Sequence, residues 1–175
     1  PAARFYADQE PAVYDPEKAK QILADGGWAD SNGDGFVEKD GVTAKIELCT
    51  TTRQVRQDTL ALVSAWLKAV GIDSIINPVA ASDIFADYNE ATLDTPCALS
   101  TSNFDLAEHA FSSSIDPLGN YFSYHSSQFH PDGANDARVK DADIDAALDT
   151  VKNNVDFAII KDAMATFQEV YVEKT

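Results

Sequence analysis

One stretch that switches hydrophobic period twice constrains the fold of this chain most. Residues 43–51, TAKIELCTT, alternate apolar and polar side chains, as a β-strand does. Residues 54–70 carry apolar side chains at spacings of three and four, which is typical of an amphipathic helix, and residues 72–79 return to a strand pattern. A strand, a helix and a strand in this order form a parallel pair with a right-handed crossover. The pattern therefore predicts an α/β fold.

Helices and a further strand are expected on both sides of this unit. Asp15 and Pro16 are typical of a helix start, and Gly26–Gly27 is typical of its end. Residues 112–138 are polar and aromatic without a period, so they are expected to be a functional loop or a lid. The other expected elements are a helix over 82–93 with Ser82 as N-cap and Ile84, Phe85 and Tyr88 inward, a strand over 104–111 with Phe104 and Leu106 on its inner side, and helices over 141–151 and 157–172.

The central helix is expected to pack through one apolar stripe. The residues that form this stripe by their spacing are Val55, Thr59, Leu62, Val63, Trp66, Leu67 and Val70.

Composition excludes several classes of protein. The chain has 175 residues and is 45% hydrophobic, so it can form a core and disorder is not expected. Its 29 acidic residues against 13 basic ones give a net charge of −16, which repels phosphate backbones and disfavours nucleic acid as a partner. No apolar run is long enough to span a bilayer. The chain opens without Met and stops inside a helical pattern, so a piece of a longer protein is expected.

Two cysteines are too few for a disulfide scaffold. Cys49 lies within a strand pattern, where a small buried apolar residue is the simplest interpretation. A single bridge between Cys49 and Cys97 in an oxidising compartment is the alternative.

The most charged stretch of the chain is the acidic loop, residues 30–41, DSNGDGFVEKDG. Its first six residues match the start of an EF-hand calcium loop, but Gly41 stands where a bidentate Glu would close the shell, and a strand pattern follows in place of a second helix. Two interpretations stay open. The loop is a tight glycine-rich turn, or it holds a structural calcium ion through Asp30, Asn32, Asp34, the Phe36 carbonyl, and Glu38 or Asp40.

The sequence contains few patterns that are typical of an active site. The three histidines, His109, His125 and His130, do not form a metal-ligand spacing on one regular element. No glycine-rich loop precedes a helix that would receive a phosphate, and no base is placed by sequence near the serine cluster Ser112–Ser114. The chain is therefore not expected to be an enzyme.

Several landmarks occur in a fixed order between about residues 10 and 172. They are YDPEKAKQIL from Tyr14, Gly27-Trp28, the DxNGDG of the acidic loop, KDG from Lys39, Arg56, LKAVGI from Leu67, FDL from Phe104, Asp116-Pro117 and IDAAL from Ile144. In this order they resemble the family 5 extracellular solute-binding proteins of the peptide/nickel type, which feed ABC importers. The resemblance implies that residues 1–175 form one lobe, the C-terminal one, of a two-lobed protein, with a mixed sheet, the other lobe being absent. In such proteins two lobes close on the ligand about a hinge.

The resemblance also implies where the ligand lies. It places the end of the first strand and the loop after the FDL strand against the ligand. The site residues carried over are Thr51, Thr52, Arg53, His109, Phe111, Ser112, Ser113 and Asp116. Open α/β sheets bind ligands at such strand ends, which agrees with this placement.

Two departures from the family pattern bear on the ligand. Peptide binders of the family often carry a Trp before the small polar loop and, three residues later, an acidic residue that holds the peptide amino terminus. This sequence has Ala110 and Ser113 at those positions. A longer peptide held by its backbone, a sugar or another polar solute is therefore expected rather than a short peptide held by its ammonium. Asp116 has a simpler role as well, since it is placed to cap a turn that Pro117 begins.

Solute capture for an ABC importer is the function that these observations favour. The expected partners are a small polar solute, peptide or sugar-like, and a membrane permease. The expected location is extracellular, periplasmic or at the cell surface, and the expected state is a monomer. The alternative is a calcium-dependent extracellular interaction module without a transport role. An α/β hydrolase that uses the serine cluster is a third, weaker hypothesis.

Overall fold

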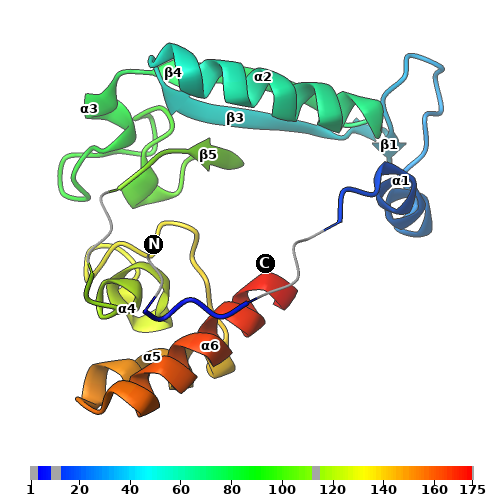
Figure 1. Ribbon diagram of the computed structural model, residues 1–175. Helices are drawn as coiled ribbons and strands as arrows, with labels where there is room; N and C mark the ends of the chain where they lie inside the picture. The colour runs from blue at the N-terminus through cyan, green and yellow to red at the C-terminus, as the bar shows by residue number, and fades with distance from the viewer. Residues whose placement is uncertain (1–3, 9–12, 112–114, 175) are drawn as a thin grey trace. The chain divides into compact units, whose positions relative to one another are not determined.

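The computed structural model describes residues 4–8, 13–111 and 115–174, and the chain divides into two compact units (Figure 1). The sheet unit is Val13–Ala110 and is continuous in sequence. The helical unit combines Pro1–Ala12 with Phe111–Thr175, so its two parts come from opposite ends of the chain. The packing of helices and strands is therefore described for each unit separately.

The sheet unit is built on three parallel strands in the order β4-β3-β5. Strand β3 (Lys45–Thr51) is central, β4 (Asp73–Val79) pairs with it along its whole length, and β5 (Leu106–Glu108) pairs with its second half. Helix α2 (Gln54–Ala69) connects β3 to β4 and runs along the two strands (Figure 1). The α/β class and the strand–helix–strand unit are thus confirmed. Pro78 lies on β4, an edge strand of the described sheet, where a missing N–H does not interrupt the ladder.

The last four residues of β3 form the centre of the unit's core. Leu48, Cys49, Thr50 and Thr51 are all buried, so this end of the strand is covered on both faces. One face packs into a cluster of buried side chains, which includes a disulfide between Cys49 and Cys97. The cluster consists of Cys49, Val79, Ile84, Cys97 and Leu99, with Phe104 and Ala107 against it.

The face of α2 that packs on the sheet differs from the expected one. Leu60 and Ser64 are its buried residues, whereas Val55, Leu62 and Trp66 are 69%, 58% and 52% exposed. The apolar spacing predicted the wrong face because a polar residue, Ser64, lies between α2 and the sheet. Ser74 of β4 donates a hydrogen bond to Ser64 over 2.8 Å, which satisfies both hydroxyls out of water.

The segment before β3 contains a hairpin that the sequence reading missed. Helix α1 (Pro16–Asp25) is capped by the Asp15 carboxylate, as expected. Strands β1 (Glu38–Lys39) and β2 (Val42–Thr43) then pair antiparallel in a sheet of their own. Asp40 and Gly41 between them have φ values of 53° and 78°. Positive φ at both central residues defines the two-residue turn that Asp-Gly favours.

Two elements after β4 are shorter than expected. The helix expected over 82–93 is only one turn, α3 (Ala81–Ile84), because polar side chains capture the backbone beyond it. Asp87 accepts a hydrogen bond from the backbone N–H of Asn89, for example. The strand expected over 104–111 is reduced to β5, after the 3₁₀ turn η1 (Leu99–Thr101). On β5 the inner residue is Ala107, whereas Leu106 is exposed, so Leu106 was assigned wrongly. Phe104, just before the strand, packs against the buried cluster as expected.

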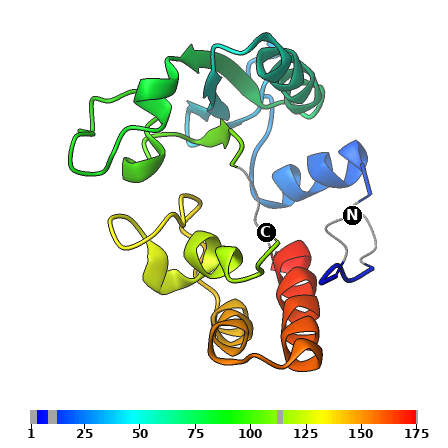
Figure 2. The same cartoon turned by 60° about the vertical axis from the view of Figure 1, so that its left-hand side comes forward.

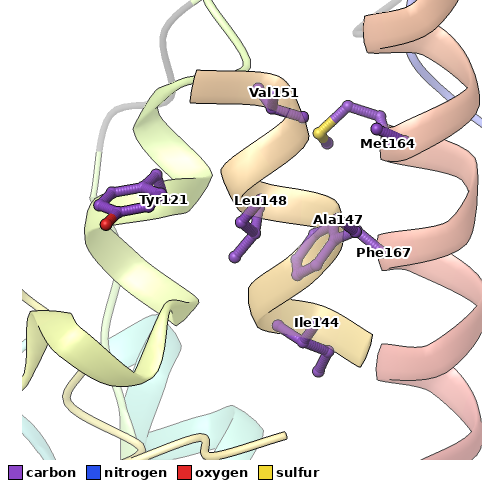
Figure 3. Close-up of a cluster of buried hydrophobic side chains, with 8 residues drawn as sticks. Tyr121, Ile144, Ala147, Leu148, Val151, Met164 and Phe167 are labelled. Atoms are coloured by element: carbon purple, nitrogen blue, oxygen red, sulfur yellow. The ribbon is translucent and has the colours of Figure 1, made fainter. Parts of the chain in front are cut away.

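The helical unit is organised by α5 (Ala142–Asn153) and α6 (Phe157–Lys174), both expected from the sequence. The two helices lie side by side with α4 (Gly119–Tyr124) against α5 (Figure 2). Their facing side chains form the core of the unit, in which Ile144 and Leu148 are completely buried (Figure 3). The buried members are Tyr121, Ile144, Ala147, Leu148, Val151, Ala163, Met164 and Phe167.

Residues 115–138 are not the structureless loop that the sequence suggested. They contain α4 and the 3₁₀ turn η2 (Ser126–Gln128). The buried Asn135 connects this segment, because its amide N–H groups donate to the carbonyls of His125 and Val139 and its oxygen accepts from the N–H of Val139. This segment is held by hydrogen bonds from one polar side chain to three backbone groups and not by a periodic apolar face. Hydrophobic spacing alone therefore does not predict its fold.

The N-terminal residues of the helical unit are attached to α6. Gln168 accepts a hydrogen bond from the N–H of Ala7 and donates one to the carbonyl of Phe5. The Phe5 and Phe157 rings lie 5.3 Å apart. In the described part of the chain, α6 and the other helices fall short of the length and apolarity needed to cross a bilayer.

Replacing the central leucine of the helical unit should destabilise it strongly. Leu148→Ala removes a completely buried side chain, so we expect a loss of about 2–5 kcal/mol in the free energy of unfolding, measured by urea denaturation. Val155→Ala is the matched control, because Val155 is fully exposed and its loss should cost less than about 0.5 kcal/mol. Equal effects of the two variants would contradict the assigned core.

Removing the disulfide should destabilise the sheet unit. Cys49 and Cys97 are 48 residues apart, and a bridge over such a loop restricts the unfolded chain by about 4 kcal/mol. We expect the variant Cys49→Ala/Cys97→Ala to unfold at lower urea concentration than the oxidised protein. A reductant should lower the midpoint of the oxidised protein and leave that of the variant unchanged; an unchanged midpoint for both would show that the bridge does not form.

Candidate ligand-binding site

The candidate site lies where β3 and β5 end. These strands are parallel neighbours, so their carboxyl ends meet at one edge of the sheet, and Thr50 is the register partner of Glu108. The N-terminus of α2 follows β3 after two residues. Loops that converge at such an edge form ligand sites in open α/β sheets. The sheet thus gathers the residues after Thr50 and after Glu108 in one place.

A hydrogen-bonded network connects these strand ends. The Thr50 hydroxyl lies 2.9 Å from the carbonyl oxygen of Glu108 and 2.8 Å from its carboxylate Oε2. Arg56, in the first turn of α2, donates from Nη1 to the hydroxyl of Thr51 over 3.1 Å. Its Nε lies 3.7 Å from Glu108 Oε2, which is an ion-pair distance and not a hydrogen bond. The network fixes the two strands and the helix start relative to one another.

Sequence reasoning missed Glu108 as a member of this site. The resemblance pointed to the residues after it, and Arg56 entered only as a landmark. A signal was nevertheless present, because a glutamate within an expected strand needs partners for its charge wherever it is removed from water. The Thr50 hydroxyl and the Arg56 guanidinium are those partners.

Four of the predicted site residues belong to the sheet unit. Thr51 is buried and engaged by Arg56, whereas Thr52 and Arg53 are exposed at the start of α2. Arg53 is the N-cap of α2 but makes no side-chain capping hydrogen bond. His109 follows β5, and its ring meets the edge of Phe85 with the centroids 6.1 Å apart. The structure therefore brings all four to the carboxyl ends of β3 and β5.

The other predicted site residues belong to the helical unit or lie outside the described part of the chain. Phe111 is exposed. The Asp116 carboxylate accepts a hydrogen bond from the N–H of Leu118 over 2.9 Å, which is the turn-capping role that Asp116-Pro117 suggested. Ser112 and Ser113 lie outside the described residues, as does Ser114.

The acidic loop closes on itself. Asp30 accepts hydrogen bonds from the backbone N–H groups of Gly33 and Gly35, and Asp34 accepts one from Phe36. Glu38 accepts hydrogen bonds from the N–H and the hydroxyl of Ser31. The loop is thus held in shape by its own carboxylates.

Only part of the predicted calcium shell is gathered. Oxygens of Asp30, Asp34 and Glu38 lie within 4.8 Å of one another. The Asn32 side-chain amide points its N–H groups at Asp34 and Glu38 and its oxygen accepts from the N–H of Asp34. Asp40 is not in the group, because it occupies the hairpin turn between β1 and β2. Either interpretation of the loop, turn or calcium site, is compatible with this geometry.

Histidine does not take part in a metal-ligand cluster within the described residues. The second group of side chains close enough to share an ion is Glu47, Cys49 and Cys97, whose sulfurs are joined in the disulfide. His130 pairs with Asp136 at 2.6 Å, and His125 accepts a hydrogen bond from the N–H of Ser127. These two histidines therefore serve local structure in the helical unit.

Comparison with known sequences identifies the relatives of this chain. Residues 1–132 match the family described as bacterial extracellular solute-binding proteins, family 5 Middle. The oligopeptide-binding protein AppA of Bacillus subtilis is 33% identical over 141 residues, which are 80% of this chain and 24% of AppA.

Solved structures agree on the fold. AppA in complex with a nonapeptide aligns with a TM-score of 0.74 at 27% identity, over 95% of this chain and 32% of AppA. An oligopeptide-binding protein of Thermus thermophilus complexed with a pentapeptide gives 0.79 at 22% identity, over 98% and 30%. NikZ of Campylobacter jejuni in complex with Ni(L-His) gives 0.75 at 24% identity, over 91% and 30%.

This chain spans about a quarter to a third of the length of these relatives. The match to the family covers most of the chain, and the identity to AppA extends over four-fifths of it. The chain belongs to the family 5 bacterial extracellular solute-binding proteins.

Proposed function

We propose that this chain is part of the substrate-capturing component of an ABC importer and contributes one lobe to a site for a polar solute. The family membership and the AppA likeness support the role in capture. The component acts outside the membrane, as a monomer, and delivers the solute to a membrane permease. The site residues are those predicted from the sequence at the ends of β3 and β5 and in the loop that follows.

The convergence of hydroxyl and charged side chains at the ends of β3 and β5 is the observation that carries this proposal. Thr52 and Arg53 are exposed there, next to the fixed pair of Thr50 and Glu108. The strand pairing fixes the backbone at this edge, so a polar solute can bind there without rearrangement of the strands.

Capture without chemistry fits the chain better than its alternatives. The relatives named above are solute-binding proteins, which favours a binding role over hydrolysis by the serine cluster. A calcium-dependent interaction module receives no support from these relatives. The solute is peptide or sugar-like, since exposed hydroxyl and guanidinium groups suit amide carbonyls, carboxylates and sugar hydroxyls.

Solute binding by the full-length protein should depend on the exposed residues at the end of β3. We expect isothermal titration calorimetry to detect binding of at least one of three probes: a nonapeptide, mannohexaose or the nickel–histidine complex. Thr52→Ala and Arg53→Ala should each weaken that binding about five-fold or more, because each removes hydrogen bonds worth about 1 kcal/mol or more.

Thr43→Ala is the matched control for this test, because Thr43 is exposed on β2, away from the strand ends. Its affinity should equal that of the wild type. Equal affinities for all three variants would remove the end of β3 from the site, and absence of binding to every probe would argue against solute capture.

The acidic loop is proposed as a structural calcium site, with Asp30, Asp34 and Glu38 as its charged ligands. Three carboxylates within 4.8 Å of one another repel, and a bound divalent cation relieves that repulsion. Oxygen ligands of this kind suit calcium. The proposed role is to hold the loop between α1 and β1 and involves no solute chemistry.

Calcium should raise the melting temperature of the protein, and magnesium should raise it less. Asp34→Asn keeps an acceptor for the N–H of Phe36 but removes one charge, so this variant should lose the calcium-dependent increase. Differential scanning fluorimetry with and without EDTA measures the effect. A wild-type melting temperature that does not respond to calcium would identify the loop as a turn held only by its own hydrogen bonds.

A further inference from the structure

Glu108 is held in place through only one of its two carboxylate oxygens. Its Oε2 atom accepts the hydrogen bond from Thr50 and lies within ion-pair distance of Arg56. Within the described residues, its Oε1 atom accepts no hydrogen bond. Thr50 is completely buried, so it anchors the carboxylate from inside the sheet unit. One carboxylate oxygen is thus fixed inward while the other remains open.

Within the Glu108–Arg56 ion pair, the carboxylate is the partner more accessible to a solute. The Glu108 side chain is 30% exposed, whereas that of Arg56 is only 13% exposed and is directed to Thr51. The guanidinium is thus less accessible than the carboxylate and compensates its charge only in part, across 3.7 Å. The net charge of −16 of the whole chain adds to a field that attracts cations.

We propose that Glu108 determines specificity by anchoring a cationic group of the solute, such as a primary ammonium, through Oε1. The proposal rests on solute capture at the ends of β3 and β5. It assigns a role to a residue that the sequence reading did not select, on a strand and not in the loop where Ser113 stands. It also reverses the expectation that a solute ammonium would lack an acidic partner on this chain.

The position of Glu108 suits this role chemically. A carboxylate that is already oriented by Thr50 loses little rotamer freedom when it binds a ligand. A charge-assisted hydrogen bond in a partly desolvated position is stronger than one between neutral groups. If Glu108 only held the strand ends together, its replacement would change the affinities for charged and neutral ligands equally.

Affinities of the full-length protein for a matched pair of peptides test the proposal. The probes are pentaalanine and N-acetyl-pentaalanine, which differ in the amino-terminal charge. For the wild type, calorimetry should show that pentaalanine binds at least about ten-fold more tightly. Glu108→Gln keeps the size of the side chain and an acceptor for Thr50, and it should abolish most of that ten-fold preference by weakening pentaalanine alone.

Glu47→Gln is the matched control. Glu47 is a half-buried glutamate on β3 with one side-chain hydrogen bond, from Asn77, and it lies away from the strand ends. This variant should retain the ten-fold preference. Thermal unfolding of both variants without ligand checks that each is folded.

The outcomes separate this proposal from solute capture itself. Equal wild-type affinities for the two peptides, or equal weakening of both by Glu108→Gln, would overturn the anchor and show a structural glutamate. Binding of the neutral mannohexaose with no binding of either peptide would overturn the anchor and leave solute capture standing. No binding of any of the three probes would contradict both.

Discussion

The pairing of β3 on both sides is the constraint on which the sheet unit depends. Backbone hydrogen bonds join β3 to β4 along seven register pairs and to β5 along three, and both faces of its last residues are buried. A strand in this position has no freedom to shift by one residue, since a shift would turn Leu48 and Cys49 to the wrong faces. The disulfide from Cys49 then attaches the irregular segment before η1 to the same strand. The residues after Thr50 are therefore positioned by a rigid strand, and a binding site needs such support to hold its side chains in place.

Much of the fold was predictable because it follows hydrophobic period and capping. The strand–helix–strand unit, α1 with its Asp15 cap, α5 and α6 all carry such signals. The parts that could not be predicted are held by polar side chains. Ser64 meets Ser74 beneath α2, Asp87 captures the backbone after α3, and Asn135 organises the segment after α4. Such contacts leave no periodic trace in a sequence, because their partners are specific atoms and not a face.

The candidate site shows the same division. Thr51, Thr52, Arg53 and His109 were predicted through family resemblance, and the structure places them at the ends of β3 and β5. Glu108 was not predicted, because its significance depends on which strand lies beside it. The hairpin turn at Asp40-Gly41 is an opposite case, since the Asp-Gly signal was visible, but the loop was left open as a turn or a calcium site and the hairpin itself was not predicted. A motif that occurs in both turns and metal sites can be assigned only when the structure of the flanking residues is known.

The division of the helical unit between the two ends of the chain has a consequence for folding during synthesis. Residues 5 and 7 are bound by Gln168, and Phe5 packs against Phe157. These contacts cannot form until α6 has left the ribosome, after the continuous sheet unit of about a hundred residues has been made. At roughly 5–20 residues per second, about 8–32 s separate the synthesis of Ala7 from that of Gln168, and strands β3, β4 and β5 are made in that interval. The sheet unit is therefore expected to fold before α6 binds residues 5 and 7 and completes the helical unit.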